Sequence, residues 1–220
     1  MKKRTIAILC AVLLFTACKK DKDPEPCSCP APTTAANDMY HFPLTIGSYW
    51  VYEEVNMDSS FNITSTPGID SVYISGDTTI SGNLYFLKRV SSFSGSFFSV
   101  LMPLVPQRDS AGYIVSPDGT YIKHDDFTDI LSATTMISPP YSNIKQMVHK
   151  DSIVTIPAGT FPTIDCREHI TILDPAYTGN RNKYNHLVMA NNIGIVFRSS
   201  CFYSSPMMIG LRMRRYHIAP

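Results

Sequence analysis

Charge of either sign is scarce in this chain. Lysine and arginine number 19 and aspartate and glutamate 18, so the formal net charge at pH 7 is +1. Proteins that bind nucleic acid through its phosphates carry a basic surface, whereas from residue 39 to 220 the one basic cluster is Arg212, Arg214 and Arg215. Because residues two apart share one face of a strand, we interpret Arg212 and Arg214 as part of an exposed sheet face. We expect no nucleic-acid partner.

Sequence signatures of catalysis are also scarce. The chain contains no G-x-S-x-G elbow and no glycine-rich phosphate loop. Glu53 and Glu54 are adjacent, so on a strand they would face opposite ways and could not act as the carboxylate pair of a glycosidase. The remaining candidates are His124, Asp125 and Asp126, although such a run more often forms a solvated loop and helix cap. We expect a protein that is not an enzyme, with an extracytoplasmic hydrolase built from dispersed residues as the alternative.

No apolar run near the N-terminus is long enough to cross a membrane as a helix. Ile6–Phe15 has ten residues, whereas a transmembrane helix needs about 20. The run follows three basic residues (2–4) and precedes two small residues and Cys18, which is the layout of a secretory signal peptide. Small residues directly before a cysteine resemble the lipobox of bacterial lipoproteins, which implies a signal peptide over 1–17 and a palmitate-type lipid anchor on Cys18. An ordinary signal peptide that contains a cysteine is the alternative.

Residues 18–38 have the composition of a flexible tether. They are rich in charge and small residues and contain four prolines, Pro24, Pro26, Pro30 and Pro32. Such a segment buries no core and favours an extended spacer. The charged stretch Lys19–Asp23 is similar to the short signals that direct Bacteroidota lipoproteins to the outer face of the outer membrane. The resemblance implies a lipid-anchored domain at the cell surface, and the periplasmic face is the alternative location.

The patterning from residue 39 to 220 predicts one antiparallel β domain. Residues 50–55 read as a strand with Trp50, Tyr52 and Glu54 on one face, and apolar and polar residues alternate at 71–75. Turn residues separate the strands of three predicted hairpins, 113–115 with 121–122, 152–156 with 163–173, and 184–190 with 193–201, and a last strand follows at 209–218. We expect an all-β fold, a single curled antiparallel sheet that forms a half-barrel or a sandwich-like domain. Helical spacing occurs at 125–133, so we expect at most one short helix.

The first predicted strand carries a second resemblance. A large group of uncharacterised Bacteroidota lipoproteins opens with a Phe-Pro-Leu…Gly…Trp-x-Tyr pattern, and the matching residues here are Phe42, Pro43, Leu44, Gly47, Trp50 and Tyr52. Ile156–Phe161 and Asn192–Val196 resemble a hairpin and a strand of the same group. The resemblance implies a curled antiparallel sheet of unknown function and supplies no catalytic residues.

Four cysteines would remain after export and acylation, namely Cys27, Cys29, Cys166 and Cys201. An exported protein matures in an oxidising compartment, where an even number of cysteines favours disulfides. We predict a Cys166–Cys201 disulfide between strands of the C-terminal sheet, with two buried free thiols as the alternative. Cys27 and Cys29 could close a small ring, bridge to another chain or stay reduced.

We expect no metal and no cofactor. Cys166 and His169 have ligand-like spacing, but residues three apart on a strand point to opposite faces, and no further ligands have matching spacing.

Aromatic residues give the remaining indication of function. The chain has 12 tyrosines, 11 phenylalanines and one tryptophan, most of which we assign to the core of the sheet. Others fall in predicted loops, at Phe93–Phe98, Tyr141, Tyr177 and Phe202-Tyr203. Exposed rings can stack on sugars or contact a protein. We therefore expect a binding or interaction module for a glycan, a peptide or an outer-membrane protein partner.

Overall fold

The computed structural model describes residues 42–220 except 92–100, 103, 111–112, 120, 124–126 and 129, and describes 121–123 by their backbone alone. The chain divides after Asp38, and all of the described residues belong to the second unit, Met39–Pro220. In these parts of the chain, no helix is long and apolar enough to cross a membrane.

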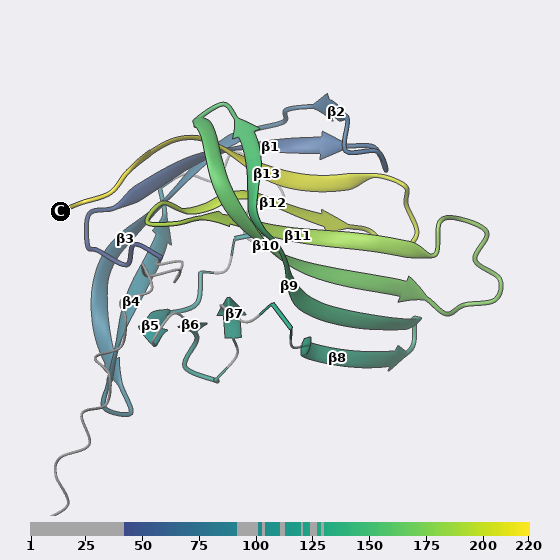
Figure 1. Ribbon diagram of the computed structural model, residues 1–220, viewed down its shortest axis with the longest axis horizontal. Coiled ribbons are helices and arrows are strands. Elements are labelled where there is room, and N and C mark those ends of the chain that lie inside the picture. Colours follow the sequence, from purple (N-terminus) through teal and green to yellow (C-terminus); the bar gives the residue numbers. More distant parts are fainter. Residues whose placement is uncertain are drawn as a thin grey trace, which may run out of the picture. The chain divides into compact units, whose positions relative to one another are not determined.

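The domain is built from one large antiparallel sheet that does not close into a barrel (Figure 1). Its neighbours follow the order β4-β3-β1-β13-β12-β11-β10-β9-β8, and β2 pairs with β1. The strands of this sheet are β1 (Tyr49–Met57), β2 (Ile63–Ser65), β3 (Ile69–Ile80), β4 (Asn83–Val90), β8 (Ile130–Ile137), β9 (Pro140–Ile156), β10 (Gly159–Ile172), β11 (Asn182–Ala190), β12 (Gly194–Cys201) and β13 (Met208–His217). A three-stranded sheet contains β5 (Arg108–Ser110), β6 (Tyr113–Val115) and β7 (Tyr121–Lys123). The predicted all-β class is confirmed.

The three predicted hairpins are present. β6 pairs with β7, β9 with β10, and β11 with β12, all antiparallel. The β9–β10 turn contains Gly159 with a φ of 140°, and a glycine at Gly119 with a φ of 83° lies in the β6–β7 connection. Both angles are left-handed, and glycine adopts them without a steric penalty. The local turn chemistry therefore determines where these strands reverse.

The helix expected at 125–133 is wrong where the structure describes it. Ile130 and the residues after it belong to β8, an edge strand that pairs with β9. Leu131 still packs against the core, as the apolar pattern requires. The β9 backbone supplies this short segment with hydrogen-bond partners, and that pairing outweighs a weak helical period.

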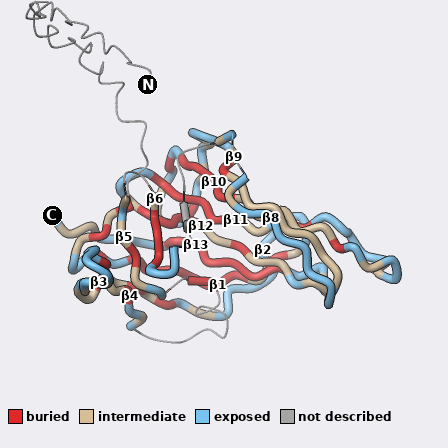
Figure 2. Tube along the Cα trace, turned by 90° about the horizontal axis from the view of Figure 1, so that it is seen from below, coloured by how far each residue is buried: buried red, intermediate tan, exposed pale blue. Residues whose placement is uncertain are grey.

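The core lies on the face of the large sheet that arches over β5–β7, which we call the inner face (Figure 1). Trp50 and Tyr52 of β1 and Leu211 of β13 are 1%, 1% and 0% exposed there. Ile114 of β6 packs into the same cluster and joins the small sheet to the large one. Figure 2 shows the buried stretches in the body of the sheet, whereas the projecting strand ends and loops are exposed or half-buried.

The segments that carry the second resemblance meet in this core. The Trp50 indole nitrogen donates a hydrogen bond to the Ile193 carbonyl at 2.6 Å, and the Tyr52 hydroxyl donates one to the Ile195 carbonyl at 2.8 Å. A Cβ at Gly194 would lie 3.1 Å from the Phe42 ring, so glycine allows the ring to pack there. Burial and these hydrogen bonds explain the motif without a catalytic role.

The opposite, outer face carries polar pairs and a small apolar cluster. Glu53 accepts a hydrogen bond from Arg212 at 2.5 Å and lies 3.6 Å from Arg214. Arg212 and Arg214 therefore share one sheet face, as the sequence predicts. Val55, Met57 and Met208 form the apolar cluster beside them.

Candidate functional site

A cavity of about 660 Å³ lies where β11 begins, β12 ends and β13 begins. We call it the strand-end cavity. Its size falls within the range of about 300–1,000 Å³ that is typical of small-molecule sites. It is lined by Ser59, Phe61, Tyr177, Thr178, Gly179, Asn180, Asn182, Lys183, Tyr184, Cys201, Ser204, Ser205, Pro206 and Met208.

The loop between β10 and β11 forms one wall of this cavity. The Asp174 carboxylate accepts a hydrogen bond from the Ala176 amide at 2.9 Å, and the Arg181 guanidinium donates to the Tyr177 carbonyl at 3.4 Å. A Cβ at Gly179 would lie 2.5 Å from the Tyr177 hydroxyl, so the Tyr177 side chain lies directly over the Gly179 backbone. These contacts give Tyr177 a defined place in the wall.

Lys183 of β11 holds the loop after β12, which forms another wall of the cavity. Its amino group donates hydrogen bonds to the carbonyls of Phe202, of Tyr203 at 2.9 Å and of Ser205 at 2.7 Å. The same group lies 5.6 Å from the centre of the Tyr177 ring. All three ammonium hydrogens therefore have acceptors inside the protein, and Lys183 acts as a structural clamp.

The turn between β1 and β2 brings Phe61 to the cavity. The Asp58 carboxylate accepts hydrogen bonds from the Ser60 and Asn62 amides at 2.8 and 3.0 Å and from the Asn62 side chain at 3.0 Å. These bonds, that of the Asn62 side chain foremost, lower the pKa of Asp58 because they favour its charged form. Phe61 has a φ of 64°, which is uncommon for a residue other than glycine. The Asp58 side chain thus holds a strained turn that presents the Phe61 ring.

Aromatic rings gather around the cavity. The Tyr177 and Tyr203 rings have centroids 5.9 Å apart, and Tyr203 continues to Tyr141 at 6.4 Å. On the other side, Phe61 meets the His186 ring edge-on at 5.3 Å. Tyr184 is 36% exposed, so part of its ring remains open to solvent. Three residues of the predicted exposed aromatic set, Tyr141, Tyr177 and Tyr203, are therefore brought together.

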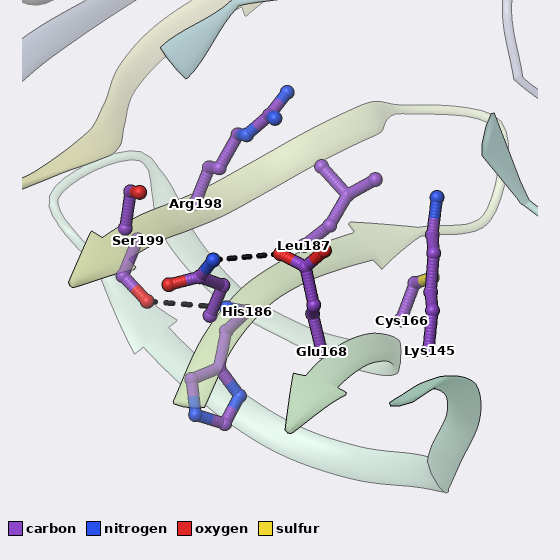
Figure 3. Close-up of a pocket in the computed structure, with 9 residues that line it drawn as sticks. Lys145, Cys166, Glu168, His186, Leu187, Arg198 and Ser199 are labelled. Carbon is purple, nitrogen blue, oxygen red and sulfur yellow. Dashed lines mark hydrogen bonds between the residues drawn. The ribbon is translucent and has the colours of Figure 1, made fainter. Parts of the chain in front are cut away.

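A second, smaller cavity of about 150 Å³ is lined by charged groups, among them Lys145, Glu168 and Arg198 (Figure 3). We call it the inner-face cavity, and it is lined by Lys145, Cys166, Glu168, Asn185, His186, Leu187, Arg198, Ser199 and Ser200. Strand register explains the arrangement, because Lys145, Glu168 and Asn185 align across β9, β10 and β11, and Cys166, Leu187 and Arg198 align across β10, β11 and β12. Figure 3 shows Arg198, Leu187, Glu168 and Lys145 projecting from one side of the sheet.

Glu168 is held in this cavity by two amides from the neighbouring strands. Asn143 of β9 and Asn185 of β11 each donate a hydrogen bond to a different carboxylate oxygen, the latter at 2.6 Å. The side-chain oxygen Oδ1 of Asn185 in turn accepts a hydrogen bond from the Cys201 backbone amide at 2.8 Å. The carboxylate is thus oriented by neutral donors.

Arg198 and Lys88 are two cations of the inner face. Arg198 is half-buried, and its partial loss of hydration lowers the pKa of the guanidinium. Lys88 of β4 is 6% exposed and its amino group lies 4.5 Å from the centre of the Phe42 ring. Burial, and secondarily the charge of Arg198, lowers the pKa of Lys88 to about 7. The two cations are therefore close enough for the charge of Arg198 to affect the protonation of Lys88.

Cys166 is not an activated nucleophile. Burial, with nearby carboxylates as a smaller cause, raises the pKa of its thiol to about 11. Because the thiolate is the reactive form, the group stays protonated and unreactive at neutral pH.

The predicted Cys166–Cys201 disulfide is wrong. Both are free cysteines, and β11 lies between β10, which carries Cys166, and β12, which carries Cys201. Two strand spacings amount to about 10 Å, beyond the Cα separation of about 7 Å that a disulfide can bridge. The two thiols also belong to clusters on opposite faces of the sheet.

Two groupings that have the composition of nucleophilic sites lack the required geometry. His186 Nδ1 lies 2.6 Å from Asp165 Oδ2, but Ser199 Oγ accepts a hydrogen bond from the His186 backbone amide at 3.2 Å. Figure 3 shows the His186 ring turned away from Ser199. Ser142 and Lys145 have the S-x-x-K spacing, yet both lie on β9, where residues three apart face opposite ways. Neither grouping joins a base to a hydroxyl.

Several predicted site residues lie outside the described part of the chain. These are Cys18, Cys27, Cys29, His124, Asp125, Asp126 and Phe93–Phe98. His169 is described and stacks on Tyr184 at 4.8 Å, on the face opposite to Cys166. Within the described ranges, no three His, Cys, Asp or Glu side chains are grouped so that they could hold a metal ion.

Sequence reasoning missed the residues that organise both cavities. Lys183, Phe61 and Arg198 come from three separate strands or turns, and their partners are distant in the chain. One signal was available for Phe61, because Asp58 with Ser60 and Asn62 has the spacing of a side-chain-capped turn. Another was Arg198, a charge inside a predicted apolar strand.

No protein-family model matches the chain, and no curated protein matches it. Two crystal structures resemble it in fold, each with a TM-score of 0.47 over 81% of this chain and 99% of the other. One is a candidate lipoprotein from Parabacteroides distasonis ATCC 8503, at 13% identity. The other is a candidate exported protein with a YmcC-like fold from Bacteroides fragilis NCTC 9343, at 11% identity. At such low identity, no residue role carries over from either structure to this chain.

Proposed function

We propose that this chain is a lipid-anchored, extracytoplasmic binding protein that takes a neutral saccharide in the strand-end cavity. The observation that carries the proposal is the meeting of aromatic rings with hydroxyl and amide side chains around one open cavity. The anchor is Cys18, and the outer face of the outer membrane is the proposed location.

The chemistry of the cavity walls matches the surface of a sugar. The rings of Phe61, Tyr177 and Tyr184 offer flat apolar faces that can stack on the C–H faces of a pyranose. Asn180 and Asn182 supply both donors and acceptors for sugar hydroxyls. Lys183 is the charged side chain among the described lining residues, and its hydrogens are taken by three carbonyls. A neutral ligand is therefore favoured over an anion at this site.

The N-terminal sequence supports the proposed location. A basic start, a ten-residue apolar run and small residues before Cys18 together resemble a lipoprotein signal. The proline-containing stretch 18–38 would span at most about 70 Å when extended. That reach is enough to hold the β domain clear of a lipid surface.

The binding proposal is tested with the full chain in detergent, titrated by calorimetry with neutral oligosaccharides chosen from a glycan array. Tyr177→Ala and Tyr184→Ala should each weaken binding by about 10-fold, because one stacked ring contributes on the order of 1 kcal/mol or more. Tyr216→Ala is the matched control, since Tyr216 is 37% exposed but lies on β13 away from the cavity lining.

Equal loss of affinity in the control would show that the effect is not local to the cavity. An array with no neutral saccharide hit, or hits that keep full affinity for both cavity variants, would overturn the saccharide assignment.

A further inference from the structure

Arg198 is a half-buried cation that lines the inner-face cavity. In the part of the chain that the structure describes, no hydrogen bond or ion pair engages its guanidinium. Glu168 is near enough to favour the charged form, but its two carboxylate oxygens are taken by Asn143 and Asn185. The N–H donors of the Arg198 guanidinium are therefore available to a group that enters the cavity.

The surroundings add positive charge and leave room for a small group. Lys88 is buried nearby, and the charge of Arg198 contributes to the lowered pKa of Lys88. Lys145 lines the same cavity as Arg198. Ser200 contributes a hydroxyl that can donate a hydrogen bond. The cavity of about 150 Å³ accommodates one small polar group and not an extended ligand.

We propose that the inner-face cavity binds a small oxyanion, a carboxylate or a phosphate group, with Arg198 as its principal ligand. The planar guanidinium presents parallel N–H donors that match two oxygens of such a group. Glu168, held by Asn143 and Asn185, lines the β10 side of the cavity. Its negative charge repels an anion, so the bound group has to lie on the Arg198 side of the cavity. The site is separate from the strand-end cavity and does not depend on saccharide binding.

The first test measures the melting temperature of the full chain in detergent with sodium phosphate, sodium acetate or sodium chloride at equal ionic strength. Phosphate, acetate or both should raise it by about 5–10 °C at 100 times the dissociation constant, whereas chloride should not. A response to phosphate alone assigns a phosphate group, a response to acetate alone a carboxylate, and a response to both an unselective oxyanion site.

Variants locate the effect. Arg198→Met should abolish the anion-dependent shift, and Arg198→Lys should weaken binding by about 10-fold because it keeps the charge but loses the paired donors. Arg215→Met is the matched control, since Arg215 is exposed and absent from the cavity lining, and it should keep the full shift. Tyr177→Ala should also keep it, which separates this proposal from the saccharide proposal.

A measurement on the wild type covers the case in which the Arg198 variants do not fold. Phenylglyoxal modification of Arg198, followed by mass spectrometry, should be slowed by phosphate or acetate, whereas modification of Arg215 should not. The proposal is overturned if neither anion shifts the melting temperature, if Arg198→Met keeps the shift, or if neither anion protects Arg198.

Discussion

At the scale of the residue, Lys88 is a cation buried at a cost to stability. Its amino group is buried against the Phe42 ring, and its pKa falls from the usual 10.5 to about 7. A cation over an aromatic face gains some electrostatic energy, but much less than hydration supplies to an ammonium group. The inner face is thus kept polar at the expense of stability, as is common where a protein binds a ligand.

Replacing Lys88 by methionine should stabilise the protein near neutral pH. Below pH 7 the folded and the unfolded chain both carry the proton, so the whole cost of burying the charge is present. Between pH 7 and 10.5 the unfolded chain binds more protons, so the free energy of unfolding of the wild type rises with pH. We expect Lys88→Met to be more stable than the wild type by at most about 5 kcal/mol at pH 6.

Urea titrations from pH 6 to 10 would measure this difference, which should shrink as the pH rises. Lys150→Met is the control, because Lys150 is exposed, and its difference from the wild type should stay constant. A Lys88→Met difference that does not change with pH would contradict the prediction.

At the scale of the element, the turn between β1 and β2 links the sheet to the strand-end cavity. β1 contributes Trp50 and Tyr52 to the core and then continues into a turn whose tip lines the cavity. The Asp58 carboxylate joins the Ser60 and Asn62 amides across this turn. The rigidity of the cavity wall therefore depends on one side chain.

Asp58→Ala should loosen the turn, weaken saccharide binding several-fold and lower the stability of the domain slightly. Because the pKa of Asp58 is lowered in the folded state, its contribution is present above the usual aspartate pKa and is lost as the pH falls through the lowered value. Calorimetry and denaturant titration would measure the two effects. Asp77→Ala, at an exposed position on β3, should change neither. Unchanged affinity in Asp58→Ala would show that Phe61 does not contribute to the site.

At the scale of the whole molecule, the two proposed sites lie on one β domain, for which we propose a lipid anchor at Cys18. The large sheet ends at β4 and β8, β4 bridges to Gln107 through Phe86, and the inner and outer faces of the sheet carry different chemistry. The strand-end cavity opens among loops, where binding residues are commonly found on rigid scaffolds.

Cys18→Ala should abolish acylation and release the protein from the membrane. Metabolic labelling with a fatty-acid analogue would show the loss, and Cys10→Ala, which replaces the other cysteine of residues 1–18, should keep the label.

Protease treatment of intact cells should digest the β domain of the wild type while a periplasmic marker stays intact. Label retained in Cys18→Ala would refute the anchor, and a protected domain would favour the periplasmic face.

The hairpins could be predicted from the sequence because their turns are local. Gly119 and Gly159 determine where the chain reverses, and strand alternation marks the faces. The disulfide prediction failed because strand order, not nearness in sequence, decides which cysteines meet. The predicted β11–β12 hairpin already places β11 between Cys166 and Cys201.

The sites could be predicted only in part. Tyr177 and Tyr203 were recognisable as loop aromatics because each stands beside turn residues, whereas Tyr141, also predicted in a loop, lies at the start of β9. Their convergence with Phe61 could not be predicted, because Phe61 belongs to the turn between β1 and β2, which is far from Tyr177 and Tyr203 in the sequence. Arg198 was not recognisable within its apolar strand. Its significance depends on the absence of a hydrogen-bond or ion-pair partner for its guanidinium in the described residues, which only the tertiary structure shows.

The sequence by itself determined the all-β class, the positions of the turns and the faces of the strands, because these depend on residues that are neighbours in the chain. The proposed anchor at Cys18 rests on a sequence segment, 1–18, that resembles a lipoprotein signal. Only the tertiary structure decided which strands lie side by side, and with them the clamp at Lys183 and the cation at Arg198. The physical reason is that a binding cavity is made by burial and hydrogen bonding between distant segments, and neither has a local signature.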